Sequence, residues 1–291
     1  MQSILVTGAG GFIGSYVVEH FFKRKCEIVQ TLREFSKLPL GVDRKNITSI
    51  EFEFNNSKGL NLSNKFDTII HCAAVLPSSG KSEQEQLDLN VLATEKLLSH
   101  CTKFLPVNFI FLSSMSVYGE VFSTVIDEET NPNPETGYGK AKLICEEMIA
   151  KHAQSNDYTA WNLRLPGVVG LGSHHNFLSD LLKQVKEKKQ ATVFNSLGLF
   201  NNAIDIGSLL RFIDLLSQNT KKIQEKMPLG ASNPITISEL VSTIFKLLKQ
   251  EENVIYRQGI SGPIISSEKA TEFGFDSPDV TKVIEELVKN C

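Results

Sequence analysis

The sequence has no run of about 18 apolar residues, the length that a membrane-spanning helix needs. It also shows no secretory signal, because Gln2 and Ser3 lead directly into an apolar run and a glycine-rich turn. The formal net charge is only −3, so the chain lacks the basic balance typical of proteins that bind nucleic acid or anionic membranes. We therefore expect a cytoplasmic protein that binds neither nucleic acid nor membrane.

Cysteine is scarce as well. The five cysteines are odd in number and scattered, and they form no Cys-x-x-Cys pair. This pattern favours free thiols in a reducing compartment over disulfides or a structural zinc site. The neighbouring His174 and His175 cannot share one helix face and have no carboxylate at ligand spacing, so we expect no metal site.

The first half of the chain alternates apolar runs with longer segments of helical periodicity. This alternation predicts an α/β fold of the Rossmann type, a doubly wound parallel sheet with helices on both faces. After Gly170 helical stretches alternate with short strands and turns. We expect a dinucleotide-binding Rossmann domain in residues 1–170 and a smaller, mostly substrate-binding α/β region in residues 171–291, with some segments returning to the first domain. The expected strands are 2–7, 27–32, 47–54, 68–74, 107–113 and 159–165, and the expected helices are 12–25, 83–104, 138–155, 176–188, 206–218, 236–250 and 277–290.

A glycine-rich turn follows the first expected strand and opens the first expected helix. Gly8 permits a sharp turn, Gly11 permits a phosphate to approach the backbone, and Gly14 permits the helix to pack closely on the strand. The start of the helix, with Phe12 and Ile13, adds free N–H donors and a partial positive charge. The turn from Gly8 to Gly14 is therefore predicted to bind the pyrophosphate of a dinucleotide cofactor.

The end of the second expected strand bears on which dinucleotide is bound. In NAD-binding folds of this type an acidic residue usually stands there and binds the ribose 2′-hydroxyl. Counting along the strand puts Leu32 at that position and Arg33 next to it. An arginine can bind a 2′-phosphate, so the sequence favours NADP over NAD. Glu34 stands one residue later, and a shift of that size would favour NAD instead.

Tyr138 and Lys142 form a Tyr-x-x-x-Lys motif near the start of an expected helix. Their spacing puts both side chains on one helix face. A tyrosine phenol has an ordinary pKa of about 10, and a neighbouring cation and a helix N-terminus both lower it. Ser114 stands at the carboxyl end of an expected strand, where ligands bind in parallel sheets. We therefore expect Ser114 and Tyr138 to bind one substrate oxygen.

These motifs resemble those of the extended short-chain dehydrogenase/reductases, the NAD-dependent epimerase/dehydratase family, whose members act mostly on nucleotide sugars. The resemblance runs the whole length of the chain, through segments 7–14, 67–74, 90–94, 113–119 and 164–170 and the pair Tyr138 and Lys142. It implies that Ser114 is the catalytic Ser/Thr, that Tyr138 is the acid/base, and that Lys142 binds the nicotinamide ribose. It also implies that the cofactor site includes Ala73, Ala74, Asn90 (mainly as a structural residue), Pro166 and Val168.

Asn176, after the sixth expected strand, matches a substrate-phosphate contact of the same family. A helix N-cap explains Asn176 equally well, and both roles are compatible.

Two departures from the family pattern narrow the reaction. Dehydratases of the family carry an Asp-Glu pair directly after the catalytic Thr, where this chain has Met115 and Ser116. Without those carboxyl groups water elimination lacks its general acid and base, so we do not expect a dehydratase. Many members also have an arginine before a Val-x-Asp-Asp motif. Residues 197–205 keep Asp205 but contain no arginine, which weakens the case for the usual binding of a sugar-nucleotide diphosphate.

Three functions fit these observations. The leading hypothesis is an NADP-dependent oxidoreductase that reduces a keto group, above all that of a 4-keto nucleotide sugar, with Tyr138 as proton donor. The first alternative is an NAD-dependent nucleotide-sugar 4-epimerase, and the second is a non-catalytic NADP-sensing protein. The resemblance further implies a homodimer formed through helices 83–104 and 138–155. The apolar residues Leu87, Val91, Leu97 and Leu98 fit a core as well as such an interface.

Overall fold

The computed structural model describes residues 1–33, 46–52, 65–173, 176–259 and 262–290. The chain forms two compact units, each assembled from three stretches of sequence. Unit 1 contains Met1–Gly119, Pro132–Arg164 and Ile213–Lys226, and unit 2 contains Glu120–Asn131, Leu165–Phe212 and Met227–Cys291. Unit 1 is therefore not continuous in sequence. The assignment of cofactor binding to one region and substrate binding to the other stays a prediction.

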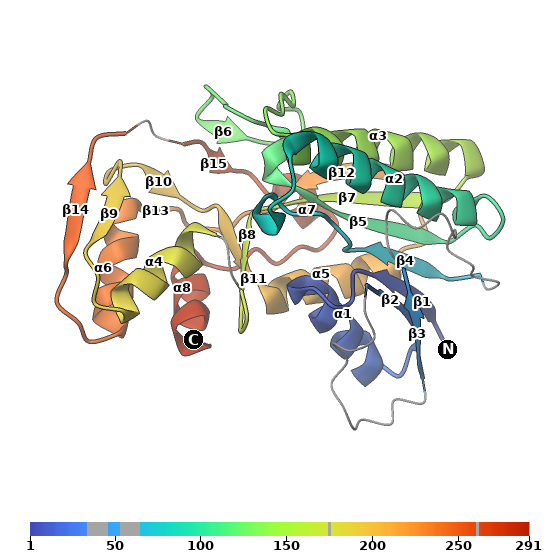
Figure 1. Ribbon diagram of the computed structural model, residues 1–291, viewed down its shortest axis with the longest axis horizontal. Coiled ribbons are helices and arrows are strands. Elements are labelled where there is room, and N and C mark those ends of the chain that lie inside the picture. The colour runs from blue at the N-terminus through green and yellow to red at the C-terminus, as the bar shows by residue number, and fades with distance from the viewer. Residues whose placement is uncertain (34–45, 53–64, 174–175, 260–261, 291) are drawn as a thin grey trace. The chain divides into compact units, whose positions relative to one another are not determined.

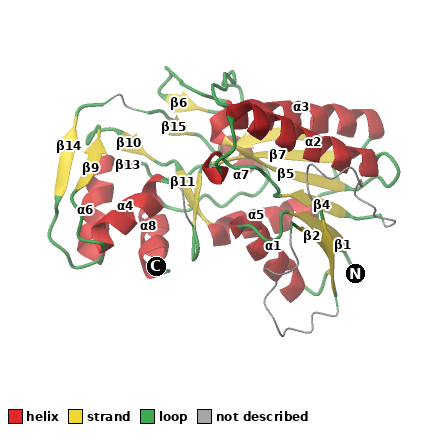
Figure 2. Ribbon diagram, viewed as in Figure 1, coloured by secondary structure: helices red, strands yellow, loops and turns green. Residues whose placement is uncertain are grey.

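A seven-stranded sheet in the order β12-β7-β5-β4-β1-β2-β3 forms the centre of unit 1 (Figures 1 and 2). The pairs β1–β2, β2–β3, β1–β4 and β4–β5 are parallel, so the expected doubly wound parallel sheet is confirmed. Strands β1 and β4 are neighbours although β2 and β3 lie between them in sequence, and ligands bind beside such a reversal of strand order. The strands are β1 (Ser3–Thr7), β2 (Glu27–Leu32), β3 (Ile47–Glu51), β4 (Thr68–His71), β5 (Asn108–Ser114), β7 (Thr159–Leu165) and β12 (Gln224–Pro228).

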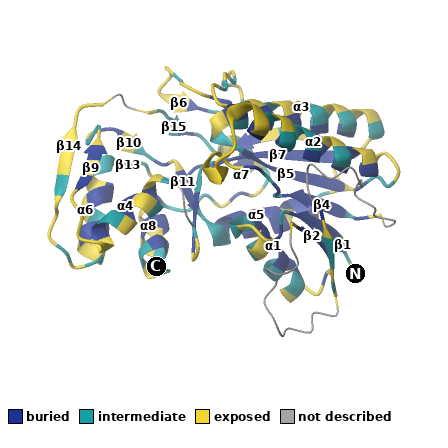
Figure 3. Ribbon diagram, in the orientation of Figure 1, coloured by how far each residue is buried: buried dark blue, intermediate teal, exposed yellow. Residues whose placement is uncertain are grey.

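Helices cover both faces of this sheet. In Figure 1, α2 (Glu83–Cys101) and α3 (Gly137–Asn156) lie on one face, and α1 (Phe12–Lys23) and the end of α5 (Ile206–Ser217) lie on the other. Figure 3 shows the central strands as buried, while α2 and α3 carry an exposed outer side. This burial explains the near-continuous apolar runs of β1, β4 and β5.

Unit 2 contains short paired strands and helices around a second apolar core. The four helices expected beyond residue 170 are confirmed, and each is shorter than expected. They are α4 (Phe177–Lys186), α5, α6 (Ile237–Leu247) and α8 (Val280–Lys289), and α7 (Glu268–Glu272) is an addition. The strand pairs are β6 (Val125–Ile126) with β15 (Ile264–Ile265), β8 (Gly167–Val169) with β11 (Ala203–Asp205), β9 (Ala191–Phe194) with β14 (Val254–Arg257), and β10 (Leu199–Phe200) with β13 (Ile235–Thr236).

Four cysteines, Cys26, Cys72, Cys101 and Cys145, are free thiols. Among the residues that the structure describes, no helix combines the length and the apolar character that crossing a membrane requires. The same residues contain no group of three or more His, Cys, Asp or Glu side chains that could hold a metal ion. His174, His175 and Cys291 lie outside the described residues.

Candidate active site

The glycine turn connects β1 to α1, and two of its glycines are required by close contacts. Gly8 has a φ of +70°, and a Cβ there would lie 2.6 Å from the Cα of Ala73. A Cβ on Gly14 would lie 2.2 Å from the backbone oxygen of Gly8. The chain can therefore turn this sharply, and α1 can start this close to the turn, only because both residues lack a side chain.

The start of α1 leaves backbone donors available. Gly11 is the N-cap residue and provides no side-chain cap, and the first turn of α1 contains no acidic residue. The first N–H groups of a helix have no partner within the helix, and a bound phosphate satisfies them. The turn from Gly8 to Gly14, with Phe12 and Ile13 in the first turn of α1, thus fits a dinucleotide pyrophosphate.

The segment after β4 lies against this turn. The Ala73 N–H donates to the Thr7 hydroxyl at 3.3 Å, and Ala74 follows it, partly exposed. Asn90 of α2 holds this segment, because its side chain accepts from the Val75 N–H at 2.8 Å and donates to the Val75 oxygen at 3.0 Å. Asn90 is 4% exposed, so its contribution to a cofactor site is to fix this segment.

The end of β2 also borders the glycine turn. The Ala9 N–H donates to the Thr31 oxygen at 3.1 Å, and the side chain of Leu32 lies 3.4 Å from the place where a Cβ on Gly10 would be. Arg33 follows directly and is exposed. Glu34 lies outside the described residues.

The structure brings Ser114, Tyr138 and Lys142 together. Ser114 ends β5, and its hydroxyl forms a hydrogen bond with Tyr138, which stands in the first turn of α3. The Lys142 Nζ lies one helical turn further on, 5.6 Å from the centroid of the Tyr138 ring. The three side chains therefore form one cluster in unit 1, at the carboxyl end of β5.

Burial decides the electrostatics of this cluster. Lys142 is 3% exposed, and its Nζ donates to the Leu112 oxygen at 2.6 Å. Burial lowers the pKa of Lys142 to about 8, and nearby Cys145, Cys72 and Glu146 oppose that effect. Burial also raises the pKa of Tyr138 to about 12, and the hydrogen bond from Ser114 opposes it. The expectation that the pKa of Tyr138 lies below its ordinary value is thus wrong for the protein alone, because desolvation by burial is the largest influence on this group and raises its pKa.

A buried network of ionic and hydrogen-bonded side chains lies next to the cluster, and no sequence motif predicted it. The Arg164 guanidinium contacts Glu146 through Nη2 at 2.7 Å and through Nε at 3.1 Å, and its Nη1 donates to the Tyr118 hydroxyl at 2.9 Å. Ser113 also donates to Glu146. The network links β5, β7 and α3 next to Ser114 and Lys142. Its signal in the sequence was a charged residue, Arg164, within an apolar strand.

Three predicted site residues belong to unit 2. Asn176 caps α4, because its Oδ1 accepts from the Ser179 N–H at 3.0 Å, so the N-cap interpretation is confirmed. Val168 is buried in β8, and Pro166, just before it, is partly buried. Asn176 also lines a cavity of about 130 Å³, together with Gly167, Phe177, Leu178, Phe200, Asn202 and Ala203. Contacts of these residues with a cofactor or substrate stay predictions.

Comparisons with known proteins agree with this geometry. The model of the NAD dependent epimerase/dehydratase family matches residues 4–226. The uncharacterized UDP-glucose epimerase YtcB of Bacillus subtilis (strain 168) is 28% identical over 275 residues, which are 90% of this chain and 87% of that protein. A decarboxylating sterol-4-alpha-carboxylate 3-dehydrogenase of Candida albicans is 26% identical over 184 residues, 59% of this chain and about half (52%) of the relative.

A solved structure supports the same fold. The UDP-glucuronic acid 4-epimerase from Bacillus cereus, in complex with NAD, aligns with 99% of this chain and 98% of its own, with a TM-score of 0.84 and 24% identity.

Proposed function

Because this chain is an enzyme of the NAD-dependent epimerase/dehydratase family, we propose that it transfers hydride between a nicotinamide cofactor and carbon 4 of a nucleotide sugar. The observation that carries this proposal is the cluster of Ser114, Tyr138 and Lys142 between β5 and α3. The similarity to a UDP-glucose epimerase over 87% of that protein's length supports a nucleotide sugar as substrate.

Each side chain of the cluster has a separate task. The Tyr138 hydroxyl exchanges a proton with the sugar oxygen as the carbon–hydrogen bond is made or broken. The Ser114 hydroxyl donates to the same oxygen and holds it beside Tyr138. Lys142 carries a positive charge below its pKa of about 8, and this charge favours the phenolate during proton transfer. The cofactor, when bound, supplies the hydride acceptor or donor.

We propose 4-epimerisation as the first reaction to test, because a relative that aligns with 90% of this chain is named a UDP-glucose epimerase, and a UDP-glucose 4-epimerase of Mus musculus is 30% identical over 56% of this chain. In this reaction Tyr138 acts as a phenolate, the form that the Lys142 charge favours, and takes a proton from the C4 hydroxyl while hydride leaves C4. It returns the proton after hydride has come back to the opposite face, so the cofactor is not consumed.

Net reduction of a 4-keto sugar is the second candidate, and the end of β2 favours it. Leu32 is 4% exposed and offers no acceptor for a ribose 2′-hydroxyl, whereas the exposed Arg33 next to it can bind a 2′-phosphate. We therefore propose NADP as the preferred cofactor of a reductase, with NAD as the alternative. Dehydration is not proposed, because Met115 and Ser116 replace the carboxyl pair.

We further propose a homodimer that forms through α2 and α3. Leu97 and Leu98 are buried in the core of unit 1, and Val91 packs against the same core. Of the apolar residues considered, Leu87, which is partly exposed, is therefore the one left for an interface. The buried free thiols Cys26, Cys101 and Cys145 fit a reducing, cytoplasmic location.

One experiment separates the candidate reactions. The purified protein is incubated with UDP-glucose and NAD, and in parallel with a UDP-4-keto sugar and NADPH. Formation of the C4 epimer with no change in absorbance at 340 nm indicates the epimerase, and stoichiometric loss of NADPH indicates the reductase. Tyr138→Phe removes the proton-transfer group and should abolish either reaction. A Tyr138→Phe protein that keeps wild-type turnover would contradict the proposal.

A further inference from the structure

Two glycines flank Tyr138, and each is packed against the backbone of another element. A Cβ on Gly137 would lie 2.0 Å from the backbone oxygen of Glu83, in the first turn of α2. A Cβ on Gly139 would lie 2.4 Å from the backbone oxygen of Ser116, just after the end of β5. No side chain fits at either position without moving one of these elements. The backbone of Tyr138 is therefore confined from two directions.

The side chain of Glu83 adds a directed contact. Its carboxylate accepts a hydrogen bond from the N–H of Gly137, the first residue of α3. This N–H is one of the four at a helix start that have no partner within the helix. The cap of α3 itself, Thr136, accepts from Gly139 instead, at 3.1 Å. The donor immediately before Tyr138 is thus satisfied by a different helix, 54 residues away in sequence.

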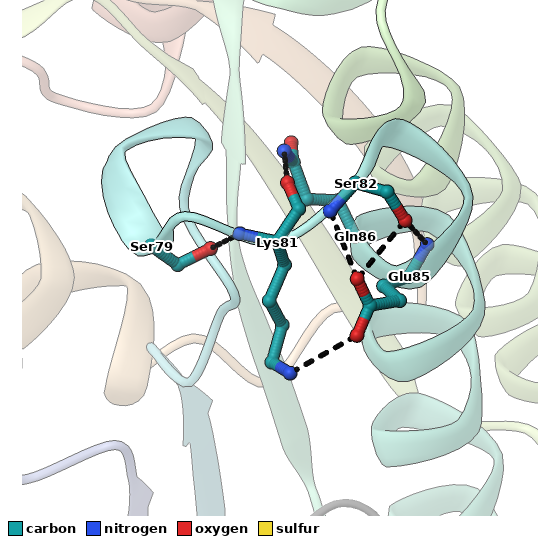
Figure 4. Close-up of polar contacts among 5 residues, drawn as sticks. All are labelled: Ser79, Lys81, Ser82, Glu85 and Gln86. Carbon is teal, nitrogen blue, oxygen red and sulfur yellow. Dashed lines mark hydrogen bonds and ion pairs between the residues drawn. The ribbon is translucent and has the colours of Figure 1, made fainter.

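Hydrogen bonds and an ion pair hold the first turn of α2 in place, as Figure 4 shows. The Ser82 N–H donates to the Glu85 carboxylate at 2.9 Å, and the Glu85 N–H donates to the Ser82 hydroxyl at 3.3 Å, which together form a capping box. Lys81 bonds the other oxygen of Glu85 at 3.3 Å, and the Gln86 side chain donates to the Lys81 oxygen at 2.8 Å. Glu83 therefore extends from a well-ordered helix start.

We propose that Glu83 is a positioning residue for Tyr138: its carboxylate holds the first N–H of α3, so that the tyrosine hydroxyl stays beside Ser114. This inference rests on the proposed function, because it takes Tyr138 as the proton-transfer group. Tyr138 and Lys142 stand on the first two turns of α3, so a rotation of the helix start moves the phenol relative to Ser114. Misplacement of a reacting group by about 1 Å can lower a rate by about 100-fold.

The test compares Glu83 with Glu85, a second exposed carboxylate in the same helical turn. Glu83→Ala removes the acceptor for Gly137, and it should lower kcat about tenfold, while KM and the cofactor Kd stay within about twofold. Glu83→Gln keeps an amide oxygen as acceptor, and it should keep kcat within about threefold. Glu85→Ala removes the capping box but keeps the acceptor for Gly137, so it should lower the thermal midpoint and keep kcat within about threefold. Equal kcat losses in Glu83→Ala and Glu85→Ala, or an equal loss in Glu83→Gln, would overturn the proposal.

A second measurement needs no substrate. In protein labelled with ¹³C at tyrosine Cζ, the Tyr138 resonance is assigned by its loss in Tyr138→Phe. Glu83→Ala should move this resonance toward its position in Ser114→Ala, and Glu83→Gln and Glu85→Ala should leave it in place. An unmoved resonance in Glu83→Ala would refute the positioning role, whatever the activity. A moved resonance in a protein that acts on no nucleotide sugar would leave the positioning role standing and refute the proposed function.

Discussion

Replacing Lys142 with methionine should abolish catalysis and make the protein more stable at neutral pH. Lys142 is 3% exposed, and burial lowers its pKa from an ordinary 10.5 to about 8. At pH 7 the folded protein therefore holds an ammonium group that is more favourably solvated in the unfolded chain. At about 1.4 kcal/mol per pH unit, this lowering corresponds to about 3 kcal/mol of destabilisation.

Methionine removes that penalty but also removes a contact. The Nζ of Lys142 donates to the Leu112 oxygen at 2.6 Å, and the loss of this hydrogen bond costs about 1–2 kcal/mol. The expected net gain for Lys142→Met is thus about 1–2 kcal/mol at pH 7. The penalty in the wild type is complete below the folded-state pKa of about 8, and it disappears as the pH rises through the ordinary pKa of 10.5, above which both states are neutral. The gain should therefore shrink over this range and reverse its sign near its upper end.

The assay is urea denaturation of both proteins at several pH values between 7 and 10.5, followed by circular dichroism. Taking the difference between the two proteins cancels the titration of the groups that do not interact with Lys142. Lys140→Met, an exposed position in the same helix, is the control and should change the free energy of unfolding by less than about 0.5 kcal/mol. A Lys142→Met protein that is less stable than wild type at pH 7, or a difference that does not vary with pH, would refute the reasoning.

Four other changes test separate parts of the structure. Gly14→Ala places a Cβ 2.2 Å from the Gly8 oxygen and should abolish cofactor binding in a fluorescence titration. Arg33→Ser should weaken NADPH binding about tenfold and leave NADH binding within about twofold, as measured by calorimetry; equal affinities in the wild type would contradict the 2′-phosphate role. Asn176→Ala removes the cap of α4 and should lower the free energy of unfolding, measured by urea denaturation, by about 1 kcal/mol. Asn176→Ser keeps a capping hydroxyl and should keep the stability of the wild type. If Asn176 contacts the substrate, Asn176→Ser should raise KM. Glu146→Ala leaves the buried guanidinium of Arg164 without its carboxylate, and it should lower the free energy of unfolding by about 3–5 kcal/mol. Replacing both residues with apolar ones should restore most of this stability. A double variant as unstable as Glu146→Ala would show that the loss does not come from an unpaired charge.

The sequence predicted the strands and helices of unit 1 well where apolar runs end at glycine or polar residues. The expected limits of β2 and β7 are those of the structure. The edge strand β12 was not predicted as a strand, because its sequence Gln-Glu-Lys-Met-Pro contains no apolar run and only Met227 and Pro228 are buried. An edge strand needs less apolar surface than a central one, so periodicity does not reveal it.

In the candidate site, too, the sequence predicted contacts between residues close in sequence and missed contacts between residues far apart in sequence. Tyr138 and Lys142 stand four residues apart, so their spacing alone predicted a shared helix face. The contact between Glu83 and Gly137 and the pair Glu146 and Arg164 join residues that are distant in sequence, and no local pattern reports such pairings. The predicted direction of the Tyr138 pKa shift was wrong for a related reason. Burial raises this pKa, and the burial of a side chain depends on the whole fold.

The position of β12 has a consequence for the order in which the protein is made. Every residue of β7 is buried, and its outer edge is covered by a strand that begins about sixty residues later, with the Ala160 N–H donating to the Ile223 oxygen at 2.9 Å. While the ribosome is still translating the residues in between, the nascent chain carries an apolar strand with an open hydrogen-bonding edge, which can pair with other chains. A fragment that stops at residue 170 keeps that edge open permanently. A fragment that contains only the glycine turn and the Tyr138 cluster is therefore not expected to fold as an independent domain, because their sheet is completed only when Gln224–Pro228 has been synthesised.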